Sequence, residues 1–359
     1  MIDDPNLSTE DLTDIKEAIH RAYSRQGSLQ VALSQNWGLQ LGDVVALPAP
    51  YLEIIDGLVE WAHSKGRALD LLAMLWRETP GNPKLKEAAQ RLLPSPAAAL
   101  NQPQTTRNMI ASSAKGVPAS LEAMVNPRSQ LINFGAFLEK LKVIGSAICR
   151  VETPVSKGTG FLIGPNTVMT NYHVVEKLQA NLPPGNVVTC RFDYWNAEPG
   201  ADPKGTPVKL RRDNWLRDWS PYSDSDLGAK GQPTDKELDY ALLVLDSPMN
   251  ASRIPLALST EPPVVMREDV VTVLQHAKGA FLGLAWGVVT EFPGNGLRYR
   301  YDVTTDHGSS GAPLFAANLD LIGLHHAADP ANDPIYNQSV PLWRIARELE
   351  ANNILLTSL

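Results

Sequence analysis

The sequence predicts a multidomain chain in which an all-α helical bundle precedes an all-β double β-barrel with a C-terminal helix. Its 359 residues exceed the length of one ordinary domain. Apolar residues recur at helical spacing in the first part of the chain, whereas short apolar segments separated by turns dominate after Ser146. Many short strands of that kind are typical of β-barrels rather than of a parallel sheet. We therefore predict a helical domain at 1–93, a linker at 94–130 and a β domain at 131–359.

The helical domain begins with a predicted helix over residues 7–24. Ser8 can cap this helix, and Asp11 stands where the acidic partner of a capping box is expected. The apolar residues between Leu12 and Ala22 fall on one face. Further helices are predicted over 28–36, 50–65, 67–78 and 82–93. The helix at 67–78 is apolar almost all round, which predicts that it lies at the centre of the bundle.

The remainder of the chain is predicted from its turns and its apolar segments. Residues 94–130 contain few large apolar side chains, which is typical of a mobile linker. Helical periodicity returns over 131–143, and we expect that helix to pack on the β domain, whereas 194–237 is predicted to be a long polar loop. Strands of the first barrel are predicted at 146–151, 159–164, 167–170 and 187–193. Strands of the second barrel are predicted at 270–275, 280–291, 297–303, 312–316, 320–326 and 334–340, followed by a closing helix at 341–352.

Composition and charge narrow the range of partners. Hydrophobic residues make up 43% of the chain and charged residues 20%, as in a soluble globular protein. A formal net charge of −7 argues against nucleic acid or an anionic membrane as the main partner. No apolar run approaches membrane-spanning length, and the first residues lack the basic and apolar regions of a signal peptide.

The cysteine content bears on the compartment. Cys149 and Cys190 are the only two cysteines. So low a count favours a reducing compartment, because secreted domains are often stabilised by several disulfides. We expect a cytoplasmic location, with a single bridge between the two cysteines as the alternative.

The segment with the clearest chemical signal is 306–313, which reads Asp-His-Gly-Ser-Ser-Gly-Ala-Pro. Gly308 and Gly311 predict a sharp turn with Ser310 at its centre. A serine hydroxyl becomes a nucleophile only when a base is held against it, and the oxyanion that it forms requires preoriented N–H groups. The N–H groups of Gly308 and Ser310 can supply them, although a plain glycine-serine turn would have the same sequence.

Two other segments supply candidates for the base and for its acidic partner. Residues 158–175 predict a strand, a tight turn and a second strand, followed by His173 at the start of a helical turn. In residues 238–245, Asp239 stands directly before an apolar segment that is predicted to be a strand. A buried carboxylate needs a partner, and a histidine is a suitable one. Taken alone, His173 would be interpreted as a structural histidine and Asp239 as a surface acid.

The order His173, Asp239, Ser310 is the order used by chymotrypsin-like enzymes. Over about residues 140–345 the sequence resembles the chymotrypsin-fold (trypsin-like) serine peptidases, and more closely their bacterial glutamyl-endopeptidase-like branch. The resemblance implies that Ser310 is the nucleophile, His173 the general base and Asp239 the residue that orients the imidazole. It also implies an oxyanion hole formed by Gly308 and Ser310.

One position departs from the digestive members of that family. They carry an aspartate directly before the nucleophile, which pairs with a newly cut N-terminus, whereas this chain has Ser309. That activation route should therefore be absent. We hypothesise that the helical domain controls activity through assembly or loop ordering.

The resemblance also suggests where the primary specificity pocket lies. Thr305 precedes Ser310 by five residues and His325 follows it by 15, which are the places where glutamyl endopeptidases line the pocket for an acidic side chain. Asp306 could instead favour basic residues, and a small or apolar preference is a third alternative. His325 could also pack as a neutral core residue, and the neighbouring His326 complicates the assignment.

No metal or cofactor is expected. The seven histidines show no metal-ligand spacing. A phosphate-binding glycine loop is not found either.

The helical domain carries a second resemblance. Its leucine-rich helices are joined by Gly-Arg-Ala-Leu-Asp-Leu-Leu at 66–72 and Pro-Gly-Asn-Pro-Lys-Leu at 80–85. These segments are similar to bacterial effector-associated domains, which are death-like adaptors. The resemblance implies homotypic binding to a matching domain on a partner protein, with a stabilising prodomain as the alternative.

Together these features suggest a serine endopeptidase that acts as an effector in an anti-phage or conflict system. The helical domain would recruit or activate it, and a gasdermin-like pore-forming protein is a candidate substrate by family analogy. One alternative is a housekeeping glutamyl-endopeptidase-like protease. Another is a catalytically silent scaffold that binds peptides.

Overall fold

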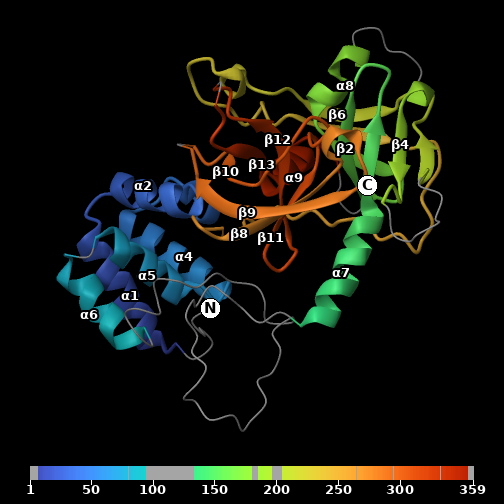
Figure 1. Cartoon of the computed structure of the whole chain (residues 1–359). Helices are drawn as coiled ribbons and strands as arrows, with labels where there is room; N and C mark the ends of the chain where they lie inside the picture. The colour runs from blue at the N-terminus through green and yellow to red at the C-terminus, as the bar shows by residue number, and fades with distance from the viewer. Residues whose placement is uncertain are drawn as a thin grey trace. The chain divides into compact units, whose positions relative to one another are not determined.

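A computed structural model describes residues 7–79, 81–93, 133–179, 185–195, 204–263, 265–293, 295–331 and 333–354 of the chain. The chain divides into two compact units, a helical N-terminal unit and a β-rich unit that begins at Phe134 (Figure 1). The all-α and all-β parts that the sequence predicts are therefore both present. The predicted linker at 94–130 lies outside the described residues.

Six helices are described in the helical unit. They are α1 (Thr9–Ala22), α2 (Gln26–Trp37), α3 (Leu41–Val44), α4 (Tyr51–Ser64), α5 (Ala68–Glu78) and α6 (Pro83–Leu92). Five of them match the predicted helices. Helix α3 was not predicted, because four residues are too few to show helical periodicity.

Local sequence explains how α1 begins and why α5 is central. Ser8 Oγ accepts a hydrogen bond from the N–H of Asp11, and the Asp11 carboxylate accepts one from the N–H of Ser8, so the predicted capping box is formed. In α5 every residue from Ala68 to Leu75 is buried, as its apolar pattern predicts.

A buried ion pair stands at the start of α5. Arg67 Nε lies 2.7 Å from Asp70 Oδ2, and the two side chains are 0% and 3% exposed. The Arg67 guanidinium also lies over the Trp37 ring at 5.6 Å. The Gly-Arg-Ala-Leu-Asp motif thus places a paired charge inside the helical unit, where either partner alone would be costly.

The first part of the β-rich unit is a seven-stranded antiparallel sheet in the order β5-β4-β1-β2-β3-β7-β6. Its strands are β1 (Ile148–Glu152), β2 (Lys157–Gly164), β3 (Thr167–Thr170), β4 (Thr189–Phe192), β5 (Thr206–Lys209), β6 (Leu216–Ser220) and β7 (Tyr240–Val244). Helix α7 (Phe134–Ala147) leads into β1, and α8 (Tyr172–Gln179) follows β3.

The second part is a closed six-stranded barrel in the order β10-β13-β12-β11-β8-β9, drawn in orange and red in Figure 1. Its strands are β8 (Val270–Gln275), β9 (Gly283–Glu291), β10 (Tyr299–Tyr301), β11 (Pro313–Ala316), β12 (Leu321–Ala328) and β13 (Asn337–Pro341), and α9 (Leu342–Ala351) follows. One cluster of buried apolar side chains, which includes Leu243 of the sheet and Leu324 of the barrel, runs through both parts.

The predicted polar loop at 194–237 is wrong in part. Strands β5 and β6 and a 3-10 turn at Asp224–Leu227 lie within it. β6 is an edge strand whose residues alternate between exposed and partly buried positions. The charged Asp218 is at a partly buried position and the apolar Trp219 at an exposed one, which hides the alternation of apolar and polar residues.

None of the described helices has the length and apolar character needed to cross a membrane.

Candidate active site

The turn expected around Ser310 is present between β10 and β11. Gly308 and Gly311 adopt positive φ values of 94° and 86°. A Cβ atom at Gly308 would lie 2.6 Å from the carbonyl oxygen of His276, and one at Gly311 would lie 2.1 Å from that of Thr159. Only glycine satisfies both the backbone conformation and the close approach at these two positions.

The backbone of this turn orients two N–H groups. The carbonyl groups of His307 and Ser309 each accept a backbone hydrogen bond, of 2.5 Å and 2.9 Å. The N–H groups of Gly308 and Ser310 belong to the same two peptide planes and therefore point the opposite way. In the parts of the chain that the structure describes, neither N–H group has an acceptor. Both are available to a developing oxyanion.

A buried threonine of β2 holds the turn in place. The Thr159 N–H donates to the carbonyl of Ser310 at 2.8 Å, and Thr159 Oγ1 donates to that of Gly308 at 2.8 Å. The same Oγ1 accepts the N–H of His276 at 2.9 Å, and Thr159 is 0% exposed. One side chain of the sheet thereby fixes the geometry of a loop of the barrel.

His173 and Asp239 form a doubly hydrogen-bonded pair. The distance from His173 Nδ1 to Asp239 Oδ2 is 2.7 Å, and the His173 backbone N–H donates to Asp239 Oδ1 at 3.1 Å. Asp239 has a φ of 44°, and its main chain is held by hydrogen bonds to Pro221 and Asn171. A non-glycine residue in this region is strained, and such strain persists only where neighbouring contacts impose it.

The contact between His173 and Asp239 also shifts the pKa values of both side chains. Burial alone raises the pKa of the Asp239 carboxyl, but the charges and hydrogen bonds of His173 and His326 lower it more, so its pKa lies well below the usual range. Burial lowers the pKa of His173, but Asp239 raises it more, so the net shift is upward. Asp239 is therefore ionised at neutral pH, and His173 readily accepts a proton.

Ser310 is partly exposed, and its Oγ makes no hydrogen bond to any described residue. The structure thus joins His173 and Asp239 by hydrogen bonds. Among the described residues, no hydrogen bond links Ser310 Oγ to either of them. Hydrogen bonds between a nucleophile and its base are often long in unliganded enzymes and shorten when substrate binds.

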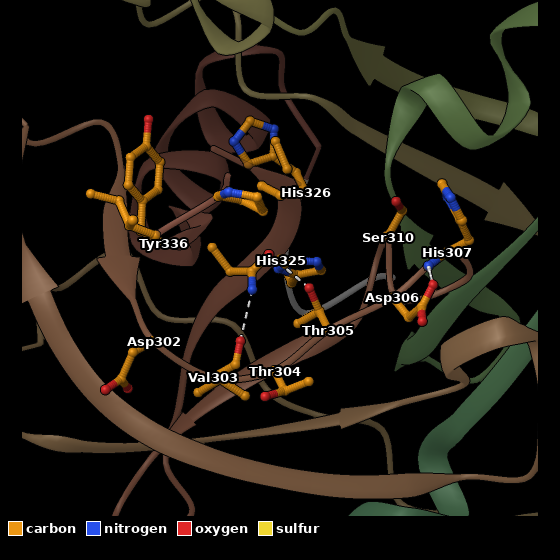
Figure 2. A pocket seen from close by; sticks show the side chains of 15 residues that line it. Asp302, Val303, Thr304, Thr305, Asp306, His307, Ser310, His325, His326 and Tyr336 are labelled. Carbon is orange, nitrogen blue, oxygen red and sulfur yellow. Dashed lines mark hydrogen bonds between the residues drawn. The ribbon is translucent and has the colours of Figure 1, made fainter. Parts of the chain in front are cut away.

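A cavity of about 570 Å³ adjoins Ser310 (Figure 2). Its walls come from the segment before the nucleophile, from β12 and from the segment that leads into β13. The lining residues include Thr305, Asp306, Ser310, His325, His326, Tyr336 and Asn337. Both predicted pocket residues, Thr305 and His325, therefore lie on the cavity that contains the predicted nucleophile.

The polar groups of this cavity are bonded to one another. Thr305 Oγ1 donates to Asn337 Oδ1 at 2.7 Å, and Asn337 Nδ2 donates to the carbonyl of Val303 at 2.7 Å. His325 Nδ1 lies 2.7 Å from the hydroxyl of Tyr301. Burial lowers the pKa of His325 to about 3, with further lowering from nearby histidines, so this ring is uncharged at neutral pH.

Asp306, the basis of the alternative basic preference, lines the cavity but already has partners of its own. Its carboxylate accepts the N–H of His307 and lies 3.4 Å from Lys278 Nζ. No group of metal-ligating side chains occurs among the described residues.

Three residues of the site escape sequence reasoning. Thr159 lies in a glycine-rich strand segment, but nothing local indicates that its hydroxyl reaches the nucleophile turn. Asn337 lies within the predicted strand 334–340 without any distinguishing pattern. His326 stands beside a predicted pocket residue, yet it contacts Asp239 instead. Each role depends on contacts between residues far apart in the chain.

Comparisons with known proteins give two family matches and several relatives. Residues 158–324 match the family model of the trypsin-like peptidase domain, and residues 5–93 match effector-associated domain 1. A glutamyl endopeptidase of Staphylococcus epidermidis is 25% identical over 206 residues, which cover 55% of this chain and 62% of that protein. The uncharacterized protein y4fB of Sinorhizobium fredii is 27% identical over 213 residues, which cover 54% of this chain and 29% of that protein. The match thus spans less than two thirds of either relative.

Solved structures that the chain matches include the inactive form of the M. tuberculosis protease Rv3671c. It is 21% identical, with a TM-score of 0.40 and coverage of 59% of this chain and 91% of that one. A serine endoprotease from Yersinia pestis is 13% identical, with a TM-score of 0.43 and coverage of 61% and 66%. Both TM-scores are low.

The family matches confirm the two resemblances drawn from the sequence. They fall on the two units that the structure separates. Residues 5–93 are thus similar to an effector-associated domain and residues 158–324 to a trypsin-like peptidase domain.

Proposed function

We propose that the chain is a serine endopeptidase in which His173, Asp239 and Ser310 form the catalytic triad. The observation that carries the proposal is the double hydrogen bond between His173 and Asp239. Ser310 adds support because it stands in a glycine turn, beside a cavity, with two N–H groups that have no acceptor among the described residues. The match to a trypsin-like peptidase domain points to the same chemistry.

In this mechanism Ser310 Oγ attacks the carbonyl carbon of the scissile peptide, and its proton passes to His173 Nε2. The N–H groups of Gly308 and Ser310 hold the oxyanion. The C–N bond then breaks, and His173 gives its proton to the leaving amine. Water attacks the acyl-enzyme with His173 as base, which releases the acid product and restores Ser310. Asp239 holds the imidazole tautomer and stabilises the imidazolium.

Labelling with a fluorophosphonate, together with hydrolysis of a casein substrate, tests this proposal. The full chain is compared with Ser310→Ala and with Ser252→Ala, which removes an exposed serine outside the site. We expect the Ser310→Ala protein alone to lose both signals. Labelling that persists in Ser310→Ala, or a wild-type chain that neither labels nor cleaves, would contradict the triad and favour a peptide-binding scaffold.

We propose further that the cavity at Thr305 and His325 selects the residue before the scissile bond, with a preference for an acidic side chain. Support comes from the hydroxyl and ring donors that line it and from the similarity to a glutamyl endopeptidase. His325 is uncharged, so it would act as a hydrogen-bond donor rather than as a cation. Peptides that differ only in Glu, Asp, Gln, Lys or Ala at this position test the preference. Fastest cleavage after Lys or Ala would reject it.

The cellular role that we propose is that of an anti-phage effector in the cytoplasm. The effector-associated domain at 5–93 would bind a matching domain on a partner protein and bring the peptidase to its substrate, for which a gasdermin-like protein is one candidate. The free state of Cys149 and Cys190 supports a reducing compartment. Phage plaque assays with the natural gene neighbours and a Ser310→Ala control test this role. Equal protection by both proteins, or no protection by either, would favour a housekeeping protease.

A further inference from the structure

A second histidine reaches the triad carboxylate because β12 is irregular. Neighbouring residues of a regular strand point to opposite faces. In β12 the register with β13 shifts between His325 and Ala327, and a bulge of this kind re-aims the side chains around it. His325 contacts Tyr301, whereas His326 contacts Asp239.

His326 lies between two buried carboxylates. Its Nδ1 is 3.2 Å from Asp239 Oδ2, and its Nε2 is 3.8 Å from Asp226 Oδ1. The His326 side chain is 1% exposed, and those of the two aspartates are 1% and 5% exposed. Water has almost no access to either contact, so each polar group depends on the protein for its partners.

Asp226 is itself held by several donors. Arg298 approaches it with Nε at 3.0 Å and Nη2 at 2.7 Å, in the two-pronged geometry typical of arginine and a carboxylate. Gln338 Nε2 donates to it at 2.9 Å and the backbone N–H of Ser223 at 3.1 Å. The Asp226–Arg298 pair is thus held in place next to Nε2 of His326, on the side of the ring that is opposite Asp239.

These contacts decide which ring nitrogen carries the proton. An ionised carboxylate only accepts hydrogen bonds, so the Nδ1 that faces Asp239 must be the donor. The charged or titratable groups around His326 are Asp239, Asp226, Arg298, His173 and His325. Burial and Arg298 lower the pKa of His326, which leaves a neutral ring with its proton on Nδ1.

We propose that His326 is a positioning residue of the triad, which donates from Nδ1 to Asp239 while the Asp226–Arg298 pair borders the Nε2 side of its ring. The proposal rests on the proposed peptidase function. Asp239 Oδ2 would then receive two donors, His173 and His326, and its lone pairs would be held in the direction that the catalytic imidazole requires. His326 is one of the residues that line the cavity, but the role proposed for it is exerted through Asp239.

Two substitutions separate this role from simple packing. His326→Phe keeps the size and shape of a ring but removes the donor. His326→Asn is smaller, yet its amide can donate from nearly the position of Nδ1. If the hydrogen bond matters, His326→Phe lowers kcat by about 10-fold to 100-fold with little change in KM, and His326→Asn recovers most of that loss. If packing matters instead, His326→Phe is the better of the two.

The pH profile gives a second readout. Without the His326 donor, the Asp239 charge acts more strongly on the imidazolium of His173, so the acid limb of kcat/KM should move to higher pH in His326→Phe. That limb should stay near its wild-type position in His326→Asn. Equal rates and equal limbs in both variants and the wild type would overturn the proposal.

Loss of folding or of the proposed function can be told apart from failure of this inference. Thermal unfolding of each variant shows whether it folds, and Ser310→Ala shows whether the measured activity belongs to the triad. Histidine-selective ¹⁵N NMR of the wild-type chain needs no substitution at His326. A protonated Nδ1 and an unprotonated Nε2 on His326 are expected, and the reverse tautomer would overturn the proposal even if His326→Phe does not fold.

Discussion

Asp239 combines nearly complete burial with a left-handed backbone, directly before β7. The strand behind it is buried along its whole length, so the carboxylate enters the interior with it. Its main chain and its side chain then meet donors and acceptors on several sides. A residue held this firmly can orient an imidazole without a further conformational step.

Replacing the Asp239 carboxylate by an amide should remove its negative charge while the side chain keeps nearly the same shape. Asn tolerates a positive φ, so we expect Asp239→Asn to fold. Its amide N–H would face His173 Nδ1 and impose the wrong tautomer, and kcat should fall about 10,000-fold. Steady-state peptide hydrolysis measures this effect, with the exposed Asp213→Asn as the control. A loss of less than tenfold would show that Asp239 is not the orienting residue.

The pH dependence follows from the same pair. His173 must be unprotonated to act as a base, and Asp239 raises the pKa of His173 above its ordinary value of 6.5. Activity should therefore be present at high pH and should be lost as the pH falls through that raised pKa. A profile of kcat/KM against pH tests this expectation. An acid limb below the ordinary histidine pKa would mean that burial outweighs the charge of Asp239.

At the scale of single elements, the nucleophile turn depends on its glycines more than on its serines. Gly308→Ala would force a Cβ atom to within 2.6 Å of the carbonyl oxygen of His276, at a φ that favours glycine. We expect the strain to cost about 1–3 kcal/mol and to displace the oxyanion N–H, with labelling of Ser310 lost. Gly27→Ala in α2 is the matched control, because open space surrounds that position. Equal labelling of both variants would refute this account.

The buried ion pair of α5 gives a separate prediction for the helical unit. Asp70→Ala leaves the fully buried Arg67 without its carboxylate, which should destabilise this unit by about 3–5 kcal/mol. Hydrogen exchange of the full chain, followed by mass spectrometry, should show faster exchange across α5. Asp56→Ala removes an exposed partner of Lys16 and should have little effect. Unchanged α5 protection in Asp70→Ala would show that the pair contributes no stability.

Periodicity and turn chemistry predict the elements that are regular and at least half buried. The capping box of α1, the apolar α5 and the glycine turn at Ser310 are all local patterns, and all three are found. Strand β6 was missed because its charged Asp218 is partly buried while its apolar Trp219 is exposed, so polarity does not alternate as burial does. Thr159, His326 and Asn337 could not be found at all, since their partners lie 149, 87 and 32 residues away.

At the scale of the whole molecule, the two cysteines can be tested for the two alternatives given above, free thiols in a reducing compartment or a single disulfide. Cys149 and Cys190 are free and fully buried, and burial raises the pKa of the Cys149 thiol. A thiol reagent should therefore react slowly with the native chain and should titrate two thiols after denaturation without reductant. A chain reduced before denaturation is the control. Detection of no thiols in the unreduced sample would indicate a disulfide between them.

The hydrogen bonds of Thr159 connect two parts of the chain that each supply residues of the proposed triad. His173 in α8 and Asp239 directly before β7 lie in the part of the chain that forms the sheet, whereas Ser310 lies in a turn of the barrel. Thr159 of β2 is hydrogen-bonded to that turn. A cut in the segment between β7 and β8 would leave two fragments, neither of which holds a complete triad. Turnover would then require the two fragments to remain associated, so the catalytic rate would report how many molecules still hold both parts together.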